Sequence, residues 1–216
     1  MANTTTDTSN YVLHDSDIRE PLFDYLEDSF GRTRIIEEKT MGRSRADVVM
    51  VTPGLLYGIE IKSDADSYTR LASQVKDYDK FFDRNIVVVG STHALHIREH
   101  VPEHWGVITV ELVNGLYDFY ILRQPVDNPK MKYKNKLRLM WRPELAQIQL
   151  LNNMPKYREK SKDFVIGKIA ARADTGVIDS CTLNNQITEL LFERDYTTIA
   201  ETLTEYRRKA NPRSRR

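Results

Sequence analysis

Three charged residues interrupt a long apolar stretch in the first half of the chain. Asp47 opens one apolar run, and Glu60-Ile61-Lys62 closes a second run that follows the Pro53-Gly54 turn. Two apolar runs separated by Pro-Gly predict two successive strands. Side chains alternate along a strand, so Glu60 and Lys62 are expected on one face, with Asp47 beside them from the partner strand.

Two carboxylates and an ammonium on one sheet face suit phosphate chemistry. Hydrolysis of a phosphodiester needs a cation that neutralises developing charge and a group that orients water. Asp47 and Glu60 are candidate ligands for Mg²⁺ or Mn²⁺, with the carbonyl of Ile61 as a third. Lys62 is the candidate that holds the attacking water or stabilises the transition state. The alternative is a surface salt-bridge cluster, but the flanking runs are too apolar for a solvated sheet.

The surrounding periodicities predict the elements that position these residues. Apolar residues at helical spacing predict a helix that ends at Phe30, with Asp17 and Glu20 as a capping box and Pro21 in its first turn. The other elements predicted for this part are strands over 34–38, 46–52, 55–63, 85–90, 106–112 and 115–122, and helices over 67–83 and 93–100. The fold class is therefore α/β, with a mixed central sheet flanked by helices.

The remainder of the chain has a different pattern. Residues 124–136 contain two prolines and alternating lysines, which predict a basic linker. Helices are predicted over 141–151, 162–172, 182–194 and 197–209, within a helical region of residues 137–210. Residues 1–14 are predicted to be a flexible tail, and residues 211–216 a short basic tail.

Charge divides along the same boundary. Residues 1–122 contain 12 Lys and Arg against 20 Asp and Glu, a net −8, whereas residues 123–216 contain 20 against 11, a net +9. The basic half predicts nucleic-acid binding through phosphate contacts. Lys156, Arg158, Lys160 and Lys162 precede a predicted helix, where the helix dipole favours a phosphate. The alternative is a helical bundle that packs on the sheet or mediates oligomerisation, a homodimer included.

Composition excludes several other classes. Hydrophobic residues make up 40% and charged residues 29% of the chain, as in ordinary globular proteins. The single cysteine, Cys181, excludes an intramolecular disulfide and a Cys-rich zinc site, and it favours a cytoplasmic location. No apolar run approaches the roughly 20 residues that span a bilayer, so no membrane partner is expected. His93, His96 and His100 lack a recognised zinc spacing and are interpreted as surface histidines.

These motifs resemble the PD-(D/E)XK nuclease superfamily. Asp47 followed by Glu60-Ile61-Lys62, in the order helix–strand–strand–strand–helix–strand, is similar to its motif and core. A bacterial branch with R-A-D and E-I-K-S motifs is more similar still. Its motifs match Asp17-Ile18-Arg19, Glu38 (or Glu37), Arg45-Ala46-Asp47, Glu60-Ile61-Lys62-Ser63, Arg70-Leu71 and Gln74. The resemblance implies a restriction-endonuclease-like core over residues 15–123 and a metal-dependent nuclease that acts on nucleic acid, DNA foremost.

The resemblance also proposes supporting residues. Glu38 is favoured as an additional metal ligand, with Glu37 on the opposite face of its strand and Glu20 on the first helix as alternatives. Gln74 and Tyr78 form a Q-x-x-x-Y pattern similar to the exonuclease branch and share one helix side, although Tyr78 also fits the apolar stripe. The alternative function is a catalytically inactive nuclease fold that binds nucleic acid or a partner protein. DNA versus RNA and endonuclease versus exonuclease stay open.

Overall fold

The structure is a computed structural model that describes residues 12–195. Its elements, in chain order, are α1 (Asp15–Phe30), β1 (Arg34–Met41), β2 (Ser44–Thr52), β3 (Leu55–Lys62), η1 (Tyr68–Arg70), α2 (Leu71–Phe81), β4 (Arg84–Gly90), η2 (Ser91–His93), α3 (Ile97–His100), β5 (Gly106–Val113), β6 (Leu116–Arg123), α4 (Tyr133–Lys136), η3 (Leu137–Leu139), α5 (Arg142–Leu151), α6 (Lys162–Asp174) and α7 (Ser180–Glu193). The predicted helix over 197–209 and both predicted tails, apart from residues 12–14, lie outside the described residues.

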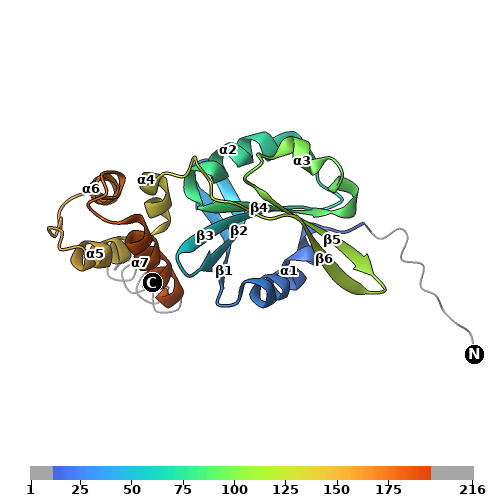
Figure 1. The fold of residues 1–216 in the computed structure, drawn as a ribbon, viewed down its shortest axis with the longest axis horizontal. Helices are drawn as coiled ribbons and strands as arrows, with labels where there is room; N and C mark the ends of the chain where they lie inside the picture. Colours follow the sequence, from blue (N-terminus) through green and yellow to red (C-terminus); the bar gives the residue numbers. More distant parts are fainter. Residues whose placement is uncertain (1–11, 196–216) are drawn as a thin grey trace, which may run out of the picture.

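A six-stranded open sheet forms the centre, as the α/β prediction requires (Figure 1). The strands lie in sequence order, β1-β2-β3-β4-β5-β6. The β3–β4 and β4–β5 pairs are parallel and the other three are antiparallel, so the sheet is mixed. The carboxyl end of β3, which carries Glu60 and Lys62, is therefore at the boundary between the antiparallel and parallel parts.

The two faces of the sheet are covered by different helices (Figure 1). On one face, Met50 and Ile59 pack in a core with Leu22 of α1. On the other face, Val51 packs in a core with Val75 of α2. Both faces of β2 and β3 are thus buried, which accounts for their almost continuous apolar sequence.

The helical region, α4 to α7, packs against the sheet through buried polar contacts. Lys136 is completely buried, and its Nζ lies 2.6 Å from Asp83 Oδ2 and 2.7 Å from Asn184 Oδ1 of α7. Arg34 of β1 donates to the carbonyl of Leu191 at the end of α7 (2.9 Å). The segment predicted as a basic linker therefore contains a helix, and one of its lysines is a buried anchor between the sheet and the helical region.

Several predicted boundaries differ for local reasons. The first helix begins at Asp15 because Asp17 accepts a hydrogen bond from the backbone of His14 (2.9 Å), so the capping residue is His14 rather than Asp17. Pro21 lies inside that helix rather than in its first turn. The predicted helix over 93–100 is reduced to one turn, Ile97–His100, preceded by a 3₁₀ turn. Leu13, predicted within a flexible tail, is buried.

Among residues 12–195, no helix combines the length and apolar character that a membrane crossing requires.

Candidate functional site

Glu60 and Lys62 lie on the same face of β3, as alternation predicts, and they form a buried ion pair. Lys62 Nζ donates to Glu60 Oε1 over 2.6 Å. The Glu60 side chain has no exposed surface, and that of Lys62 is 6% exposed. A charged pair at this depth needs further polar partners to offset its desolvation.

Asp47 joins this pair because β2 and β3 separate beside it. The β2–β3 pairing ends at Val48 and Ile59. Beyond that point the Asp47 Oδ2 accepts the backbone N–H of Ile61 over 3.0 Å, in place of a strand carbonyl. The carboxylate is thereby held between the two strands at the end of their ladder. This contact orients Asp47 toward the segment that carries Glu60 and Lys62.

Helix α2 supplies two further groups, Gln74 and Tyr78. The Tyr78 hydroxyl lies 2.8 Å from Glu60 Oε2 and 3.1 Å from the Ile59 carbonyl, and it accepts the Asp47 N–H over 3.2 Å. Gln74 Nε2 donates to Glu60 Oε1. Gln74 and Tyr78 lie on the same side of α2, as their spacing predicted. Tyr78 belongs to the hydrophobic core and also contributes its hydroxyl to the site. Gln74 Oε1 is buried with no hydrogen-bond partner among the described residues.

Gly58 permits the close approach of α2 to β3. A Cβ at this position would lie 2.2 Å from the Phe82 ring and 2.7 Å from the Tyr78 ring. Any side chain there would push α2 away from the strand. The hydroxyl of Tyr78 reaches Glu60 because this one strand position has no side chain.

Burial dominates the electrostatics of the site. Burial, helped by the nearby Asp47 charge, raises the pKa of Glu60 to about 7 against the lowering effect of Lys62 and Tyr78. Burial also raises the pKa of Asp47, although its bond from the Ile61 amide lowers it. Burial and then the Glu60 charge raise the pKa of Tyr78 well above its ordinary value, so its hydroxyl is a hydrogen-bond donor at neutral pH. Both carboxylates are therefore destabilised anions that a nearby positive charge would stabilise.

The structure does not bring Glu38 into this cluster. Glu38 has a left-handed backbone (φ 51°) and no partner in the β1–β2 register, which passes from Glu37–Val48 to Lys39–Ala46. The left-handed residue interrupts the alternation of β1 without shifting the register, so that Ile36 and Met41, five residues apart, both pack in the core with α2. The Glu38 side chain is half exposed and pairs with Arg45 (3.1 Å).

Glu37 is instead connected to the cluster through Arg19 of α1. Arg19 Nη1 lies 3.4 Å from Glu37 Oε2, and Nη2 lies 4.0 Å from Asp47 Oδ1. Asp15 holds the same guanidinium over 2.7 Å. In the sequence, Arg19 belongs only to the D-I-R match and has no predicted role. Glu20, the third candidate acid, is exposed on α1.

The donor set fits a hard cation such as Mg²⁺, which prefers oxygen ligands. Asp47 and Glu60 would provide carboxylate oxygens, and the unpartnered Oε1 of Gln74 would provide an amide oxygen. Lys62 and Gln74 hydrogen-bond to the same Glu60 oxygen, so a cation there would displace one of them. Within the described part of the chain, no group of three or more His, Cys, Asp or Glu residues is arranged to hold a metal ion.

The histidines do not form a metal site. The Tyr68 ring packs against the rings of His93 and His100, with centroids 4.8 and 4.1 Å apart. His96 is exposed and lies 3.6 Å from Glu99.

Together, the fold and the site define an α/β protein whose mixed sheet carries a buried Asp–Glu–Lys cluster supported by a helix. The family described as Bacteriophage P4 protein cII matches residues 9–178, and the chain belongs to that family. The match covers the whole sheet and extends beyond α6 in the helical region. No curated protein matches the chain. No solved structure matches it either.

Proposed function

We propose that the protein is a Mg²⁺-dependent nuclease of the PD-(D/E)XK type that hydrolyses phosphodiester bonds in DNA, with a restriction-endonuclease-like core. One observation carries the proposal: Lys62 and Glu60 form a buried pair (2.6 Å) beside Asp47, where two strands separate. The element order from α1 to β4 and the Q-x-x-x-Y contacts to Glu60 support the same interpretation. The net +9 of the second half suits a polyanionic substrate.

Each residue has a role that follows from its contacts. Asp47 and Glu60 would hold the cation, which when bound neutralises charge on the phosphate and acidifies a water. Lys62 would orient that water or the phosphate with its ammonium. Gln74 fixes one oxygen of Glu60 and offers its own carbonyl oxygen to the same space. Tyr78 positions Asp47 and Glu60 together, because its hydroxyl contacts the backbone of one and the carboxylate of the other.

A second candidate is a nuclease fold that binds nucleic acid or a partner protein without cutting. The hydrogen bonding of Glu60 favours it, since both carboxylate oxygens already have donors from Lys62, Gln74 and Tyr78. A cluster that is satisfied internally can serve as a polar core. The complete Asp–Glu–Lys set and the unpartnered Gln74 oxygen support the nuclease instead.

A cleavage assay distinguishes the two candidates. Supercoiled, linear and branched DNA and single-stranded RNA are incubated with the protein in Mg²⁺, Mn²⁺ or EDTA. The variants are Asp47→Asn and Lys62→Ala, with Lys76→Ala on the exposed face of α2 as the matched lysine control. Metal-dependent cleavage that both site variants lose and the control retains supports the nuclease. Cleavage that is absent, or equal in all four proteins, contradicts it.

A further inference from the structure

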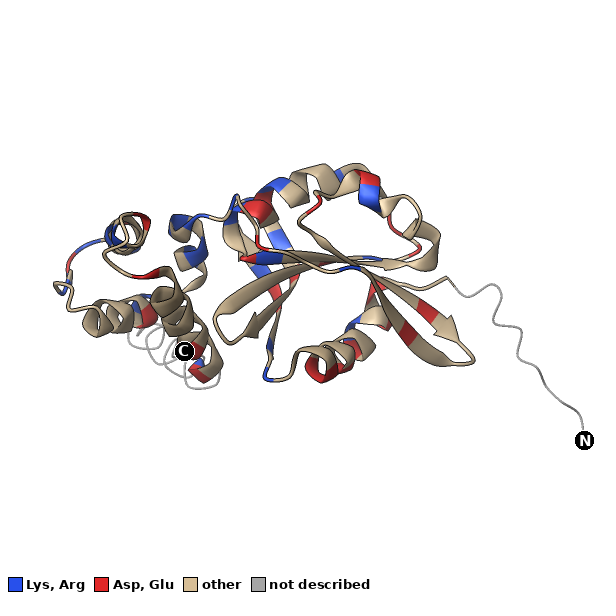
Figure 2. Ribbon diagram, viewed as in Figure 1, with Lys and Arg blue, Asp and Glu red and all other residues tan. Residues whose placement is uncertain are grey.

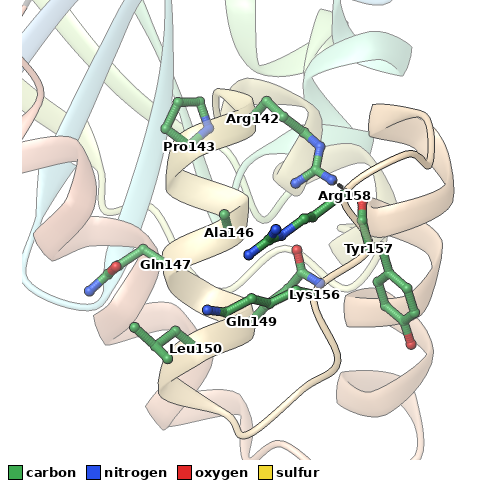
Figure 3. Close-up of a pocket in the computed structure, with 9 residues that line it drawn as sticks. All are labelled: Arg142, Pro143, Ala146, Gln147, Gln149, Leu150, Lys156, Tyr157 and Arg158. Atoms are coloured by element: carbon green, nitrogen blue, oxygen red, sulfur yellow. Dashed lines mark hydrogen bonds between the residues drawn. The ribbon is translucent and has the colours of Figure 1, made fainter.

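A basic hollow lies in the helical region, away from the elements that carry the Asp–Glu–Lys cluster. It has a volume of about 550 Å³ and lies between α5 and the loop that connects α5 to α6 (Figure 3). Arg142 from the start of α5 and Lys156 and Arg158 from the loop line it, and none of its nine lining residues is acidic. Figure 3 shows the Arg142 and Arg158 side chains extending into the same space beside α5. Three cations therefore share one concave surface.

The hollow is held in shape by backbone contacts of its own residues. Arg142 Nη2 donates to the carbonyl of Tyr157 over 2.6 Å, and Gln149 Nε2 donates to the carbonyl of Pro155 over 2.6 Å. The Tyr157 ring packs edge-on against Phe164 of α6 (5.2 Å between centroids). The loop is thus fixed to both helices. A guanidinium has five N–H donors, so the Arg142 bond to the loop leaves others for a ligand.

Part of the lining of the hollow is apolar. Pro143, Ala146 and Leu150 of α5 contribute it, and Leu150 is 59% exposed although it is a large aliphatic residue. A ligand complementary to this lining carries negative charge together with an apolar part. A volume of about 550 Å³ is within the range of small-ligand pockets, roughly 300–1,000 Å³.

The start of α6, where the sequence predicted a phosphate site, is already occupied by internal contacts. Ser161 Oγ accepts the backbone N–H of Phe164 (3.2 Å), which caps the helix. Lys162 donates to the carbonyl of Arg138 (3.0 Å), and Lys160 lies over the Phe164 ring (5.7 Å). Lys156 and Arg158, from the same basic run, line the hollow beside α5 instead. Figure 2 shows the basic positions on this connection and the acidic positions along α1.

We infer that this hollow binds single-stranded nucleic acid and accommodates one nucleotide of the strand. The phosphate contacts Arg142, Lys156 and Arg158, and the unpaired base lies against Ala146 and Leu150. Proteins that bind single strands combine a cationic groove with side chains against which bases stack, most often aromatic rings, and here Ala146 and Leu150 would provide that surface. A duplex has its bases paired and would offer only phosphates to the cations. This inference shares nucleic acid as a substrate with the proposed function, but binding here needs neither the metal nor the cleavage residues.

The test is binding of a fluorescent oligothymidine to the full chain in EDTA, over a series of salt concentrations. The double variant Lys156→Ala/Arg158→Ala should weaken binding by at least tenfold at low salt. It should also make the fall of log affinity with log salt less steep. The magnitude of the slope should decrease by about 1.4, or about 0.7 per lost phosphate contact. Lys134→Ala, an exposed lysine of α4, is the matched control and should change neither quantity.

Two further arms test the base contact. Wild-type protein should bind oligothymidine more tightly than an abasic strand of equal length, and Leu150→Ser should abolish that preference. Stronger binding to duplex DNA than to single strands would overturn the single-strand assignment. Equal loss of affinity in Lys134→Ala, or an unchanged salt slope in the double variant, would overturn the site itself. Binding in EDTA without cleavage in Mg²⁺ would contradict the proposed nuclease activity but support this binding site. Cleavage in Mg²⁺ without binding that depends on the hollow would support the nuclease activity and contradict this site.

Discussion

Glu60→Gln tests whether the central carboxylate is an anion destabilised by its burial. The side chain has no exposed surface, and burial raises its pKa to about 7 from an ordinary value of 4.5. Glutamine has the same shape and can keep the network. Its amide would donate to the Tyr78 hydroxyl, which lies 3.1 Å from the Ile59 carbonyl and can donate there instead.

The sign and size of the expected change in stability follow from the pKa of Glu60 in the folded protein and its ordinary value in the unfolded chain. The folded state holds the Glu60 proton more tightly than the unfolded chain, so this group contributes stability that is fully present below about pH 4.5 and lost as the pH rises through about 7. The difference between the folded and unfolded pKa values of Glu60 corresponds to about 3 kcal/mol of stability in total. About 2.5 kcal/mol of this is lost between about pH 5 and about pH 8. Glutamine does not titrate. The unfolding free energy of Glu60→Gln minus that of wild type should therefore rise by about 2.5 kcal/mol over this interval.

Urea unfolding in EDTA, followed by circular dichroism at several pH values, measures this difference. The variant also removes the negative charge that Lys62 faces, so the change of the difference with pH, rather than its size at one pH, is the diagnostic quantity. Glu111→Gln, at an exposed position of β5, is the matched control and should give a flat difference. A flat or falling difference for Glu60→Gln would refute the reasoning. At about pH 8, Mg²⁺ at tenfold its dissociation constant should stabilise wild type by about 1.4 kcal/mol and Glu60→Gln by much less.

Two further substitutions test the framework of the site. Gly58→Ala should destabilise the protein by about 1–3 kcal/mol in urea unfolding and abolish any cleavage, because its Cβ would overlap the rings beneath it. Gly167→Ala, where a Cβ meets nothing within 4 Å inside α6, should instead stabilise by up to about 1 kcal/mol. Lys136→Met should lower the unfolding free energy by about 3 kcal/mol, because Asp83 is left buried without its cation. Lys134→Met, at an exposed position of the same helix, should stay within about 0.5 kcal/mol of wild type.

The part of the site that sequence predicts depends on short-range periodicity. Glu60 and Lys62 are two residues apart on one strand, and Gln74 and Tyr78 are four apart on one helix. Each pair had to share a side once its element formed. The structure shows both pairs directed at one point. The α/β class and the order of the elements followed from the same periodicities.

The errors arise where a long-range contact overrides local pattern. Glu38 lies outside the cluster because its left-handed backbone interrupts the alternation of β1 from which its position was predicted. Lys136 was predicted as part of a basic linker, but it is buried and paired with Asp83. Arg142 joins Lys156 and Arg158 only after the loop folds back onto α5. No local spacing contains these partners.

The sequence by itself therefore determined the elements of this protein and the side each reactive residue takes on its own strand or helix. The tertiary structure decided which sides meet, how deeply Glu60 is buried, and which acids and bases share a space. The physical reason is that alternation and helical repeat are properties of the local backbone. Burial, electrostatic coupling and concave surfaces depend on residues that only the packed chain brings together.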